Sequence, residues 1–312
     1  MVPLTLFTGF LGAGKTTMLA HLVRERQARG DARPLAIIVN EFATLGLDAV
    51  QIPRGDHTVY ELNRGSIFCL CLRTDFIALV ERIVTELQPD ELWVEATGIA
   101  DTDELFKMLG VPSLRSVVFL RTNICLIDPH TILKILLTLR AAAQQIARAD
   151  ALVVNKTDTC SAAQLAAVEQ AVRAHNTHAP LLRARYGVVD MRAIPSFDVP
   201  RLDTRPSEGH PPQPLTSVSV CEEWTLDPDA LRAWLCAQSN AIWRAKGRVK
   251  TPRGMQWLDA TLHDIQFAPC PDEYDLPAPT ALAFVGPSLS REEILAALSA
   301  CRSTGAGPDR RG

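Results

Sequence analysis

The sequence predicts an α/β domain with a mostly parallel sheet, followed by a small α+β domain. From residue 1 to about 190, apolar runs typical of strands alternate with helical patterns, as in a parallel sheet covered on both faces. A proline-rich segment then interrupts the chain between about 195 and 215. Beyond it, five strand patterns accompany two helical ones. A chain of 312 residues is long enough for two such domains.

The strands of the first domain are predicted from their apolar runs, and polar residues follow several of them. Ligands of open α/β sheets bind in the crevice beyond the carboxyl ends of the strands, so this edge is the expected site. The segment 76–87 has apolar residues at helical spacing and predicts a helix packed on the core. The predicted strands are residues 4–8, 35–40, 92–95, 117–120, 124–127, 151–155 and 181–184.

The second domain is predicted from shorter segments. Its helices are expected at 228–236 and 291–301, and Ser290 with Glu293 has the spacing of a capping box before the second one. Its strands are expected at 216–220, 243–250, 256–262, 263–267 and 281–285. The predicted organisation is therefore a domain over 1–194, a linker over 195–215, a domain over 216–302 and a disordered tail over 303–312.

Residues 9–16 read G-x-x-x-x-G-K-[ST], a loop that wraps backbone amides around phosphates. A β-prone run precedes it and a helical pattern follows, whose N-terminus favours an anion. This context disfavours the alternative, a glycine-rich turn that carries a lysine by chance. Lys15 would bind the β- and γ-phosphates, and the Thr16 hydroxyl would bind Mg²⁺. The predicted phosphate-binding residues are Gly9, Gly12, Ala13, Gly14, Lys15, Thr16 and Thr17.

The tetrapeptide Asn155-Lys156-Thr157-Asp158 follows an apolar strand and distinguishes GTP from ATP. A carboxylate such as Asp158 accepts hydrogen bonds from N1–H and the exocyclic amine of guanine, which adenine does not present in that arrangement. A site that pairs these donors rejects a base that lacks them. A helix-capping turn is the alternative interpretation. In this position we predict guanine recognition by Asn155, Lys156 and Asp158.

Three further segments carry polar residues toward the same edge. Glu95 closes the strand 92–95, where it could orient water or hold the Mg²⁺ shell, and the amide of Gly98 could turn toward the γ-phosphate. Glu41 and Asp48 follow the strand 35–40 and could respond to that phosphate. The alternative for this last segment is a solvated acidic loop.

These motifs together resemble the CobW-type metal-chaperone GTPases, relatives of HypB and UreG. The resemblance rests on G-F-L-G-A-G-K-T-T at 9–17, V-N-E-F at 39–42 with Asp48, V-E-A-T-G at 94–98, Gln145-Ile146 with Ala149-Asp150, and N-K-T-D. Arg244-Ala245-Lys246-Gly247 and Ala283-Phe284-Val285-Gly286 resemble that family's C-terminal domain. The resemblance implies the P-loop NTPase fold and a GTPase that delivers a transition metal to a metalloprotein client.

The family's C-x-C-C motif is altered in this chain, because Ser66 and Phe68 stand where cysteines are expected and only Cys69 and Cys71 remain. Two thiolates suit a soft divalent ion but complete half of a tetrahedral site, so Glu41, His130, a second protomer or the client would supply the rest. Two cysteines packed in an apolar stretch are the alternative. The candidate metal ligands are Thr16 for Mg²⁺, and Glu41, Asp48, Cys69 and Cys71.

The composition limits the partners and the cellular location that we expect. A net charge of −3 offers no global attraction for nucleic acid or an anionic membrane, and no run of eighteen apolar residues occurs. We expect a cytoplasmic protein whose eight cysteines form no structural disulfide.

The predicted function is hydrolysis of GTP to GDP and phosphate, with Lys15, Thr16 and Glu95 as catalytic residues and GTP and Mg²⁺ as cofactors. The expected cargo metal is zinc, with cobalt, iron and nickel as alternatives, and homodimerisation is expected by analogy. The alternative functions are a nucleotide-gated client-binding or folding factor without metal cargo, and a P-loop small-molecule kinase.

Overall fold

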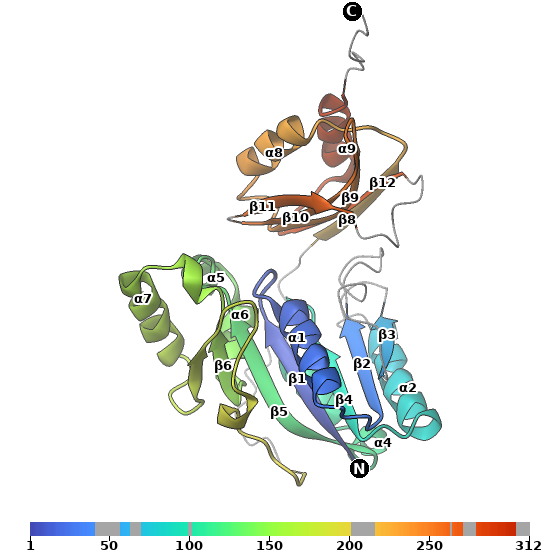
Figure 1. The fold of residues 1–312 in the computed structure, drawn as a ribbon, viewed down its shortest axis with the longest axis vertical. Coiled ribbons are helices and arrows are strands. Elements are labelled where there is room, and N and C mark those ends of the chain that lie inside the picture. Colours follow the sequence, from blue (N-terminus) through green and yellow to red (C-terminus); the bar gives the residue numbers. More distant parts are fainter. Residues whose placement is uncertain are drawn as a thin grey trace, which may run out of the picture. The chain divides into compact units, whose positions relative to one another are not determined.

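The computed structural model describes residues 1–40, 57–62, 70–98, 102–200, 216–262, 264–270 and 279–303. The chain divides into two compact units, one of residues 1–42 and 46–213 (unit 1) and one of residues 43–45 and 214–312 (unit 2). Each unit contains its own sheet with its own helices (Figure 1).

Unit 1 is built on a seven-stranded sheet in the order β3-β2-β4-β1-β5-β6-β7, in which every paired strand is parallel. Its strands are β1 (Val2–Gly9), β2 (Leu35–Asn40), β3 (His57–Leu62), β4 (Glu91–Glu95), β5 (Val118–Ile127), β6 (Ala151–Val154) and β7 (Leu181–Arg183). Its helices are α1 (Lys15–Ala28), α2 (Leu70–Glu86), α3 (Thr102–Leu109), α4 (Pro112–Arg115), α5 (Ile132–Thr138), α6 (Arg140–Ala147) and α7 (Ala162–Arg173). The predicted α/β class is confirmed.

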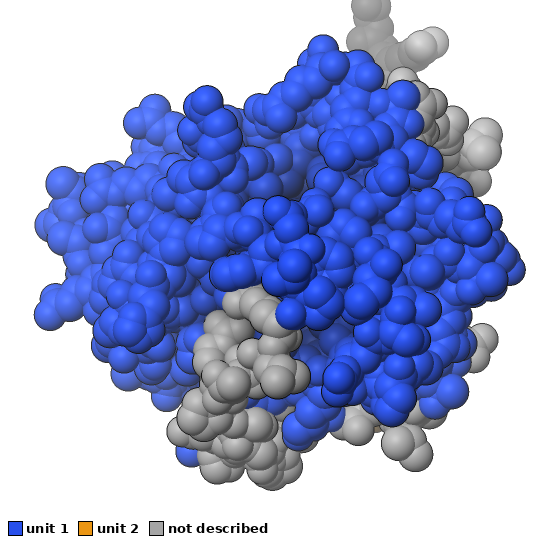
Figure 2. All heavy atoms as spheres, turned by 90° about the horizontal axis from the view of Figure 1, so that it is seen from below, with its two compact units in different colours: residues 1–42, 46–213 blue, residues 43–45, 214–312 orange. Residues whose placement is uncertain are grey.

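The helices cover both faces of this sheet because the strands alternate their apolar side chains. Leu4 and Leu6 of β1 pack in a cluster with residues of α2, α3 and α4, whereas Phe7 packs in a second cluster with residues of α1. Strands buried on both faces explain the continuous apolar runs of the sequence. Figure 2 views unit 1 from the side of the chain's N-terminus, so the carboxyl ends of the strands face away from the viewer.

The structure corrects three details of the predicted elements. β3 was not predicted, because His57, Thr58 and Glu61 give this edge strand no apolar run. The two strands predicted at 117–120 and 124–127 are the single strand β5, whose pairing with β1 shifts register between Leu4 and Thr5. The helix predicted from residue 76 begins at Leu70.

A buried ion pair joins α3 to α6 on one face of unit 1. The Asp103 carboxylate lies 2.7 Å from Nε of Arg148, and both side chains are more than nine-tenths buried. The Arg148 guanidinium also lies over the Phe106 ring, 5.6 Å from its centroid. The pair therefore anchors α3, which begins four residues after Gly98.

Removing the Asp103 carboxylate should take away an acceptor that lies 2.7 Å from the buried Arg148 guanidinium. We expect Asp103→Ala to lower the free energy of unfolding by about 3–5 kcal/mol, and Asp103→Ala with Arg148→Met to recover part of this loss. Denaturant midpoints measure both variants. Glu104→Ala is the matched control, because its partner Lys107 is more than half exposed and the pair should contribute less than about 1 kcal/mol. Equal losses in Asp103→Ala and Glu104→Ala would contradict the assignment.

Unit 2 is a five-stranded antiparallel sheet in the order β11-β10-β9-β12-β8. Its strands are β8 (Thr216–Glu222), β9 (Arg244–Thr251), β10 (Gly254–Thr261), β11 (Ile265–Pro269) and β12 (Thr280–Gly286). The helices α8 (Pro228–Ala237) and α9 (Arg291–Ala300) contribute to one core cluster with the sheet. The Ser290 side chain accepts a hydrogen bond from the Glu293 amide, as the capping sequence predicts. None of the described helices is long and apolar enough to cross a membrane.

Candidate nucleotide and metal site

The loop between β1 and α1 adopts backbone angles that only glycine accommodates well. Gly9, Gly12 and Gly14 have φ values of 125°, 78° and 97°. A Cβ on Gly9 would lie 2.1 Å from the carbonyl oxygen of Leu126, and one on Gly14 would lie 2.3 Å from the Asn155 amide nitrogen. The loop is therefore packed against β5 and against the segment that follows β6.

The α1 N-terminus and Lys15 face the inside of this loop. Lys15 Nζ donates to the carbonyl oxygens of Gly9, at 2.9 Å, and Phe10, at 3.3 Å, and its side chain is buried. Ala13 is fully buried, whereas Thr17 is exposed on the first turn of α1. A buried ammonium bonded to carbonyls at the start of a helix is arranged to receive an anion.

Thr16 and Glu95 meet across 79 positions of sequence. The Thr16 hydroxyl donates to Oε1 of Glu95 at 2.9 Å, and Glu95 is buried at the end of β4. The contact arises because β1 and β4 pair in parallel, which brings their carboxyl ends together. The structure thus places both predicted residues at one point, where a hydroxyl and a carboxylate offer the oxygen ligands that Mg²⁺ prefers.

Asn155 connects three loops at this edge of the sheet. Its Nδ2 donates to the Ala13 carbonyl at 3.0 Å, and its Oδ1 accepts from the Gly187 amide at 3.0 Å, with the side chain almost completely buried. Gly187 has a φ of 73°, and a Cβ there would lie 2.6 Å from Cα of Met18. Asn155 therefore ties the segment after β6 to the phosphate loop and to the segment after β7. Sequence reasoning did not find Gly187, since no motif marks it.

Lys156 and Asp158 follow in a short helical turn. Lys156 has a φ of 55°, and its Nζ lies 2.7 Å from Oδ2 of Asp128, a buried carboxylate directly after β5. Asp158 is exposed. The left-handed residue turns the chain so that the carboxylate of Asp158 lies at the surface, where a base could reach it.

Gly98 is packed against the phosphate loop. Its carbonyl accepts a hydrogen bond from Nε2 of Gln145 at 3.3 Å. A Cβ on Gly98 would lie 2.4 Å from the Leu11 amide nitrogen, closer than such atoms approach in proteins. The segment after β4 is therefore held between α6 and the phosphate loop.

The structure does not test the transition-metal ligands. Glu41, Asp48 and Cys69 lie outside the described residues. Cys71 belongs to the first turn of α2, and its side chain also lies outside the described part. Among the described residues, no group of three or more His, Cys, Asp or Glu side chains could hold a metal ion.

Two other cysteines differ in their surroundings. Burial raises the pKa of Cys125 to about 12, so its thiol stays protonated and unreactive within β5, as expected for a structural cysteine. Cys160 is partly exposed, and its Sγ lies 3.5 Å from Nε2 of His130. Burial, and then the charges of Asp128 and Asp158, raise its pKa. Sequence reasoning did not pair Cys160 with His130, because the two residues lie 30 positions apart.

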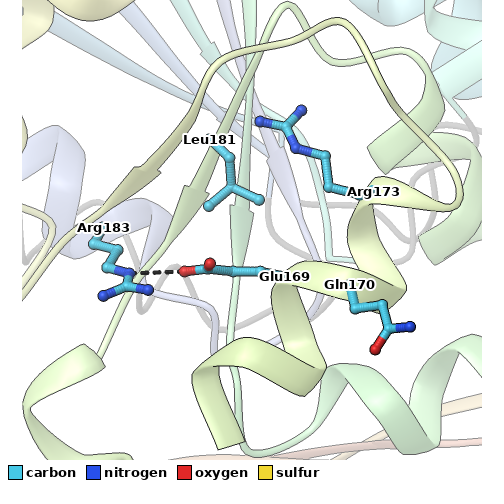
Figure 3. A pocket seen from close by; sticks show the side chains of 5 residues that line it. All are labelled: Glu169, Gln170, Arg173, Leu181 and Arg183. Carbon is cyan, nitrogen blue, oxygen red and sulfur yellow. Dashed lines mark hydrogen bonds and ion pairs between the residues drawn. The ribbon is translucent and has the colours of Figure 1, made fainter. Parts of the chain in front are cut away.

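Two hollows occur near β7, at the edge of the sheet. One of about 420 Å³ is lined by Glu169, Gln170, Arg173, Leu181 and Arg183, with an ion pair of 2.7 Å between Glu169 and Arg183 (Figure 3). The other, of about 430 Å³, is lined by Thr157, Leu165, Arg183, Arg185 and Val188. No residue of the phosphate loop lines either of these two hollows.

Two family models match this chain, one in each unit. The model "CobW/HypB/UreG, nucleotide-binding domain" matches residues 3–183, and "Cobalamin synthesis protein cobW C-terminal domain" matches residues 215–302. The chain is 27% identical over 206 residues to the zinc chaperone YeiR of Escherichia coli strain K12, covering 64% of this chain and 60% of that one. It is 31% identical over 198 residues to the zinc-regulated GTPase metalloprotein activator 1 of Schizosaccharomyces pombe, covering 61% and 47%.

Among solved structures, the chain matches that of the Zn(II)-bound YjiA GTPase from E. coli. The match has 20% identity and a TM-score of 0.46, and it covers 97% of this chain and 99% of that chain. The chain spans about three-fifths of the length of YeiR and about half of that of the metalloprotein activator. The family model covers more than half of this chain. The chain therefore belongs to the CobW/HypB/UreG family, with a CobW nucleotide-binding domain and a CobW C-terminal domain.

Proposed function

We propose that this protein hydrolyses GTP to GDP and phosphate and couples the reaction to binding zinc and delivering it to a metalloprotein client. The observation that carries the nucleotide part is the buried Lys15 ammonium, held by two loop carbonyls at the N-terminus of α1. The names of the relatives, a zinc chaperone and a zinc-regulated GTPase, support the metal part.

Phosphate binding follows from the loop. The amides around Gly12 and Gly14 and the Lys15 ammonium would bind the β- and γ-phosphates. Mg²⁺, when bound, neutralises charge on these oxygens. Thr16 and Glu95, which already share a hydrogen bond, are the residues that would hold it, Thr16 directly and Glu95 in its shell or on the attacking water. Water attacks the γ-phosphorus, and the bond to the β–γ bridging oxygen breaks to release GDP.

Base recognition is assigned to the segment after β6. Asp158 is exposed and would accept from the guanine N1–H and amine, while Lys156 is held by an ion pair with Asp128. Asn155 would hold the loops in position rather than contact the base, because its Nδ2 and Oδ1 already form hydrogen bonds with the backbone of Ala13 and Gly187. This arrangement favours GTP over ATP and speaks against a small-molecule kinase.

Metal cargo is assigned to Cys69 and Cys71, with Glu41 and Asp48 as residues that respond to the γ-phosphate. Zinc is the proposed ion, with cobalt, iron and nickel as alternatives that thiolates also bind. A cytoplasmic location, a homodimer and the domain limits 1–194 and 216–302 belong to the same proposal. A nucleotide-gated folding factor without cargo is the alternative.

The test combines phosphate release with metal analysis of the full chain. We expect phosphate release from GTP and far less from ATP. We also expect about one zinc ion per chain to be lost when Cys69→Ser and Cys71→Ser are combined, but not in the control with Cys221→Ser and Cys236→Ser, two exposed cysteines of unit 2. Unchanged zinc content in the first variant would contradict the assignment of the cargo to Cys69 and Cys71, and equal use of ATP would contradict guanine recognition.

A further inference from the structure

A histidine and a cysteine lie close together beside the segment proposed to recognise guanine. Asp128 and His130 follow β5, and Cys160 lies two residues after Asp158, so the two segments that meet at the Lys156–Asp128 ion pair also bring His130 and Cys160 together. Both side chains are partly exposed, so an ion from solvent can reach them. Neither residue has a role in the proposed nucleotide chemistry, and His130, considered above as a ligand beside Cys69 and Cys71, is paired here with Cys160 instead.

The distance between the two candidate donor atoms fits a shared metal ion. Zn²⁺ binds thiolate at about 2.3 Å and imidazole at about 2.0–2.1 Å, and a tetrahedral angle then separates sulfur and nitrogen by about 3.6 Å. Cys160 Sγ and His130 Nε2 are 3.5 Å apart. An ion could therefore bind between them with almost no change in their separation.

The other imidazole nitrogen has a neighbour that can orient the ring. His130 Nδ1 lies 3.4 Å from Nε2 of Gln164, a residue on the first turn of α7. A half-turn of that amide about its terminal bond presents Oε1, which can accept a hydrogen bond from Nδ1–H. Metal-binding histidines almost always donate their second N–H to such an acceptor, which leaves Nε2 free to bind.

The groups around the pair carry charges of both signs. The carboxylates of Asp128 and Asp158 act electrostatically on Cys160, and the Lys156 ammonium, which is paired with Asp128, opposes them. The Thr159 hydroxyl, 2.6 Å from His130 Nε2, would have to give up that contact when an ion binds. The protein supplies two ligands, so water or a client would complete the coordination, which suits an exchangeable ion rather than a structural one.

We propose that His130 and Cys160 bind Zn²⁺ as a two-ligand site beside the guanine-recognition segment, separate from Cys69 and Cys71. The binding itself is independent of the proposed function, and only its use as a point of metal transfer rests on that function. A metal bound there would join the segment after β5 to the segment after β6, both of which support Lys156.

The experiment titrates Co²⁺, a spectroscopic substitute for Zn²⁺, into the full chain carrying Cys69→Ser and Cys71→Ser. We expect a thiolate-to-cobalt absorption band that Zn²⁺ abolishes by displacement. Adding Cys160→Ser should remove the band, whereas adding Cys221→Ser, an exposed cysteine of β8, should leave it. His130→Ala and Gln164→Ala should each weaken Co²⁺ binding about tenfold or more.

A second measurement uses the wild-type chain, so its result does not depend on whether a variant folds. In the wild-type chain, Zn²⁺ should slow alkylation of Cys160 and leave that of Cys221 unchanged, as read by mass spectrometry of the peptides. Absence of the band in the Cys69→Ser, Cys71→Ser chain, its persistence after Cys160→Ser, or unaltered alkylation of Cys160 would each overturn the site. Failure of GTP hydrolysis would instead overturn the proposed function and leave this site standing.

Discussion

Replacing Lys15 by alanine should lower the rate of GTP hydrolysis at least about a hundredfold, the usual loss when one preorganised donor to a developing charge is removed. The side chain is buried and held by the Gly9 and Phe10 carbonyls, and residues 9–17 contain no other lysine or arginine. Nucleotide affinity should fall as well, because the ammonium is the cation within the loop. Phosphate release under saturating GTP and equilibrium binding of a fluorescent GDP measure the two effects.

Lys134→Ala is the matched control, since it removes an exposed lysine of α5 in the same unit. Its hydrolysis rate should stay within about twofold of the wild type. Far-UV circular dichroism and a denaturant midpoint verify that Lys15→Ala remains folded. A folded Lys15→Ala protein that hydrolyses GTP at the wild-type rate would contradict the assignment of this loop as the phosphate site.

The second large effect is expected from Asp158→Asn, which should weaken GTP binding at least about a hundredfold, because a site that pairs base donors discriminates strongly when that pairing is lost. The carboxylate accepts from N1–H and the amine of guanine, whereas an asparagine amide opposes the amine with an N–H of its own. Xanthine carries an oxygen in place of that amine, so the same variant should gain affinity for XTP. Competition of GTP, XTP and ATP against a labelled nucleotide measures this change.

Asp158 is exposed, so its substitution should leave stability almost unchanged and separate recognition from folding. Asp90→Asn, at an exposed carboxylate before β4, is the control and should bind GTP as the wild type does. If Asp158→Asn retained its preference for GTP over XTP, the N-K-T-D segment would be a helix-capping turn and the guanine assignment would be wrong.

The fold class could be predicted because strands buried on both faces leave an unmistakable apolar pattern. Residues 35–40 were predicted with the limits that β2 has, and the strands of unit 2 lie within three residues of their predicted limits. β3 escaped prediction because an edge strand is buried on fewer sides and tolerates His57, Thr58 and Glu61. β5 was divided because its polar centre, from Arg121 to Asn123, interrupts an apolar run that backbone pairing nonetheless continues.

The site was predictable where a local motif carries the chemistry and unpredictable where distant segments meet. The loop at 9–16 and the segment at 155–158 follow from their own residues. The contacts of the segment 155–158 with Asp128 and Gly187, and the contact of Gly98 with Gln145, do not, because each depends on which strands lie side by side and no spacing records that. The roles of Glu41, Asp48, Cys69 and Cys71 stay predictions.

The sequence by itself determined that this chain holds a phosphate loop on an α/β sheet, since three glycines, a lysine and a threonine can be read from consecutive positions. Only the tertiary structure decided which residues act together. Thr16 touches Glu95, and His130 touches Cys160, because parallel strands gather their carboxyl ends at one edge whatever their separation along the chain. The spacing of residues along the chain specifies a motif such as the phosphate loop. The order of strands in the sheet specifies which distant residues lie beside that motif, and the proposed reaction requires both.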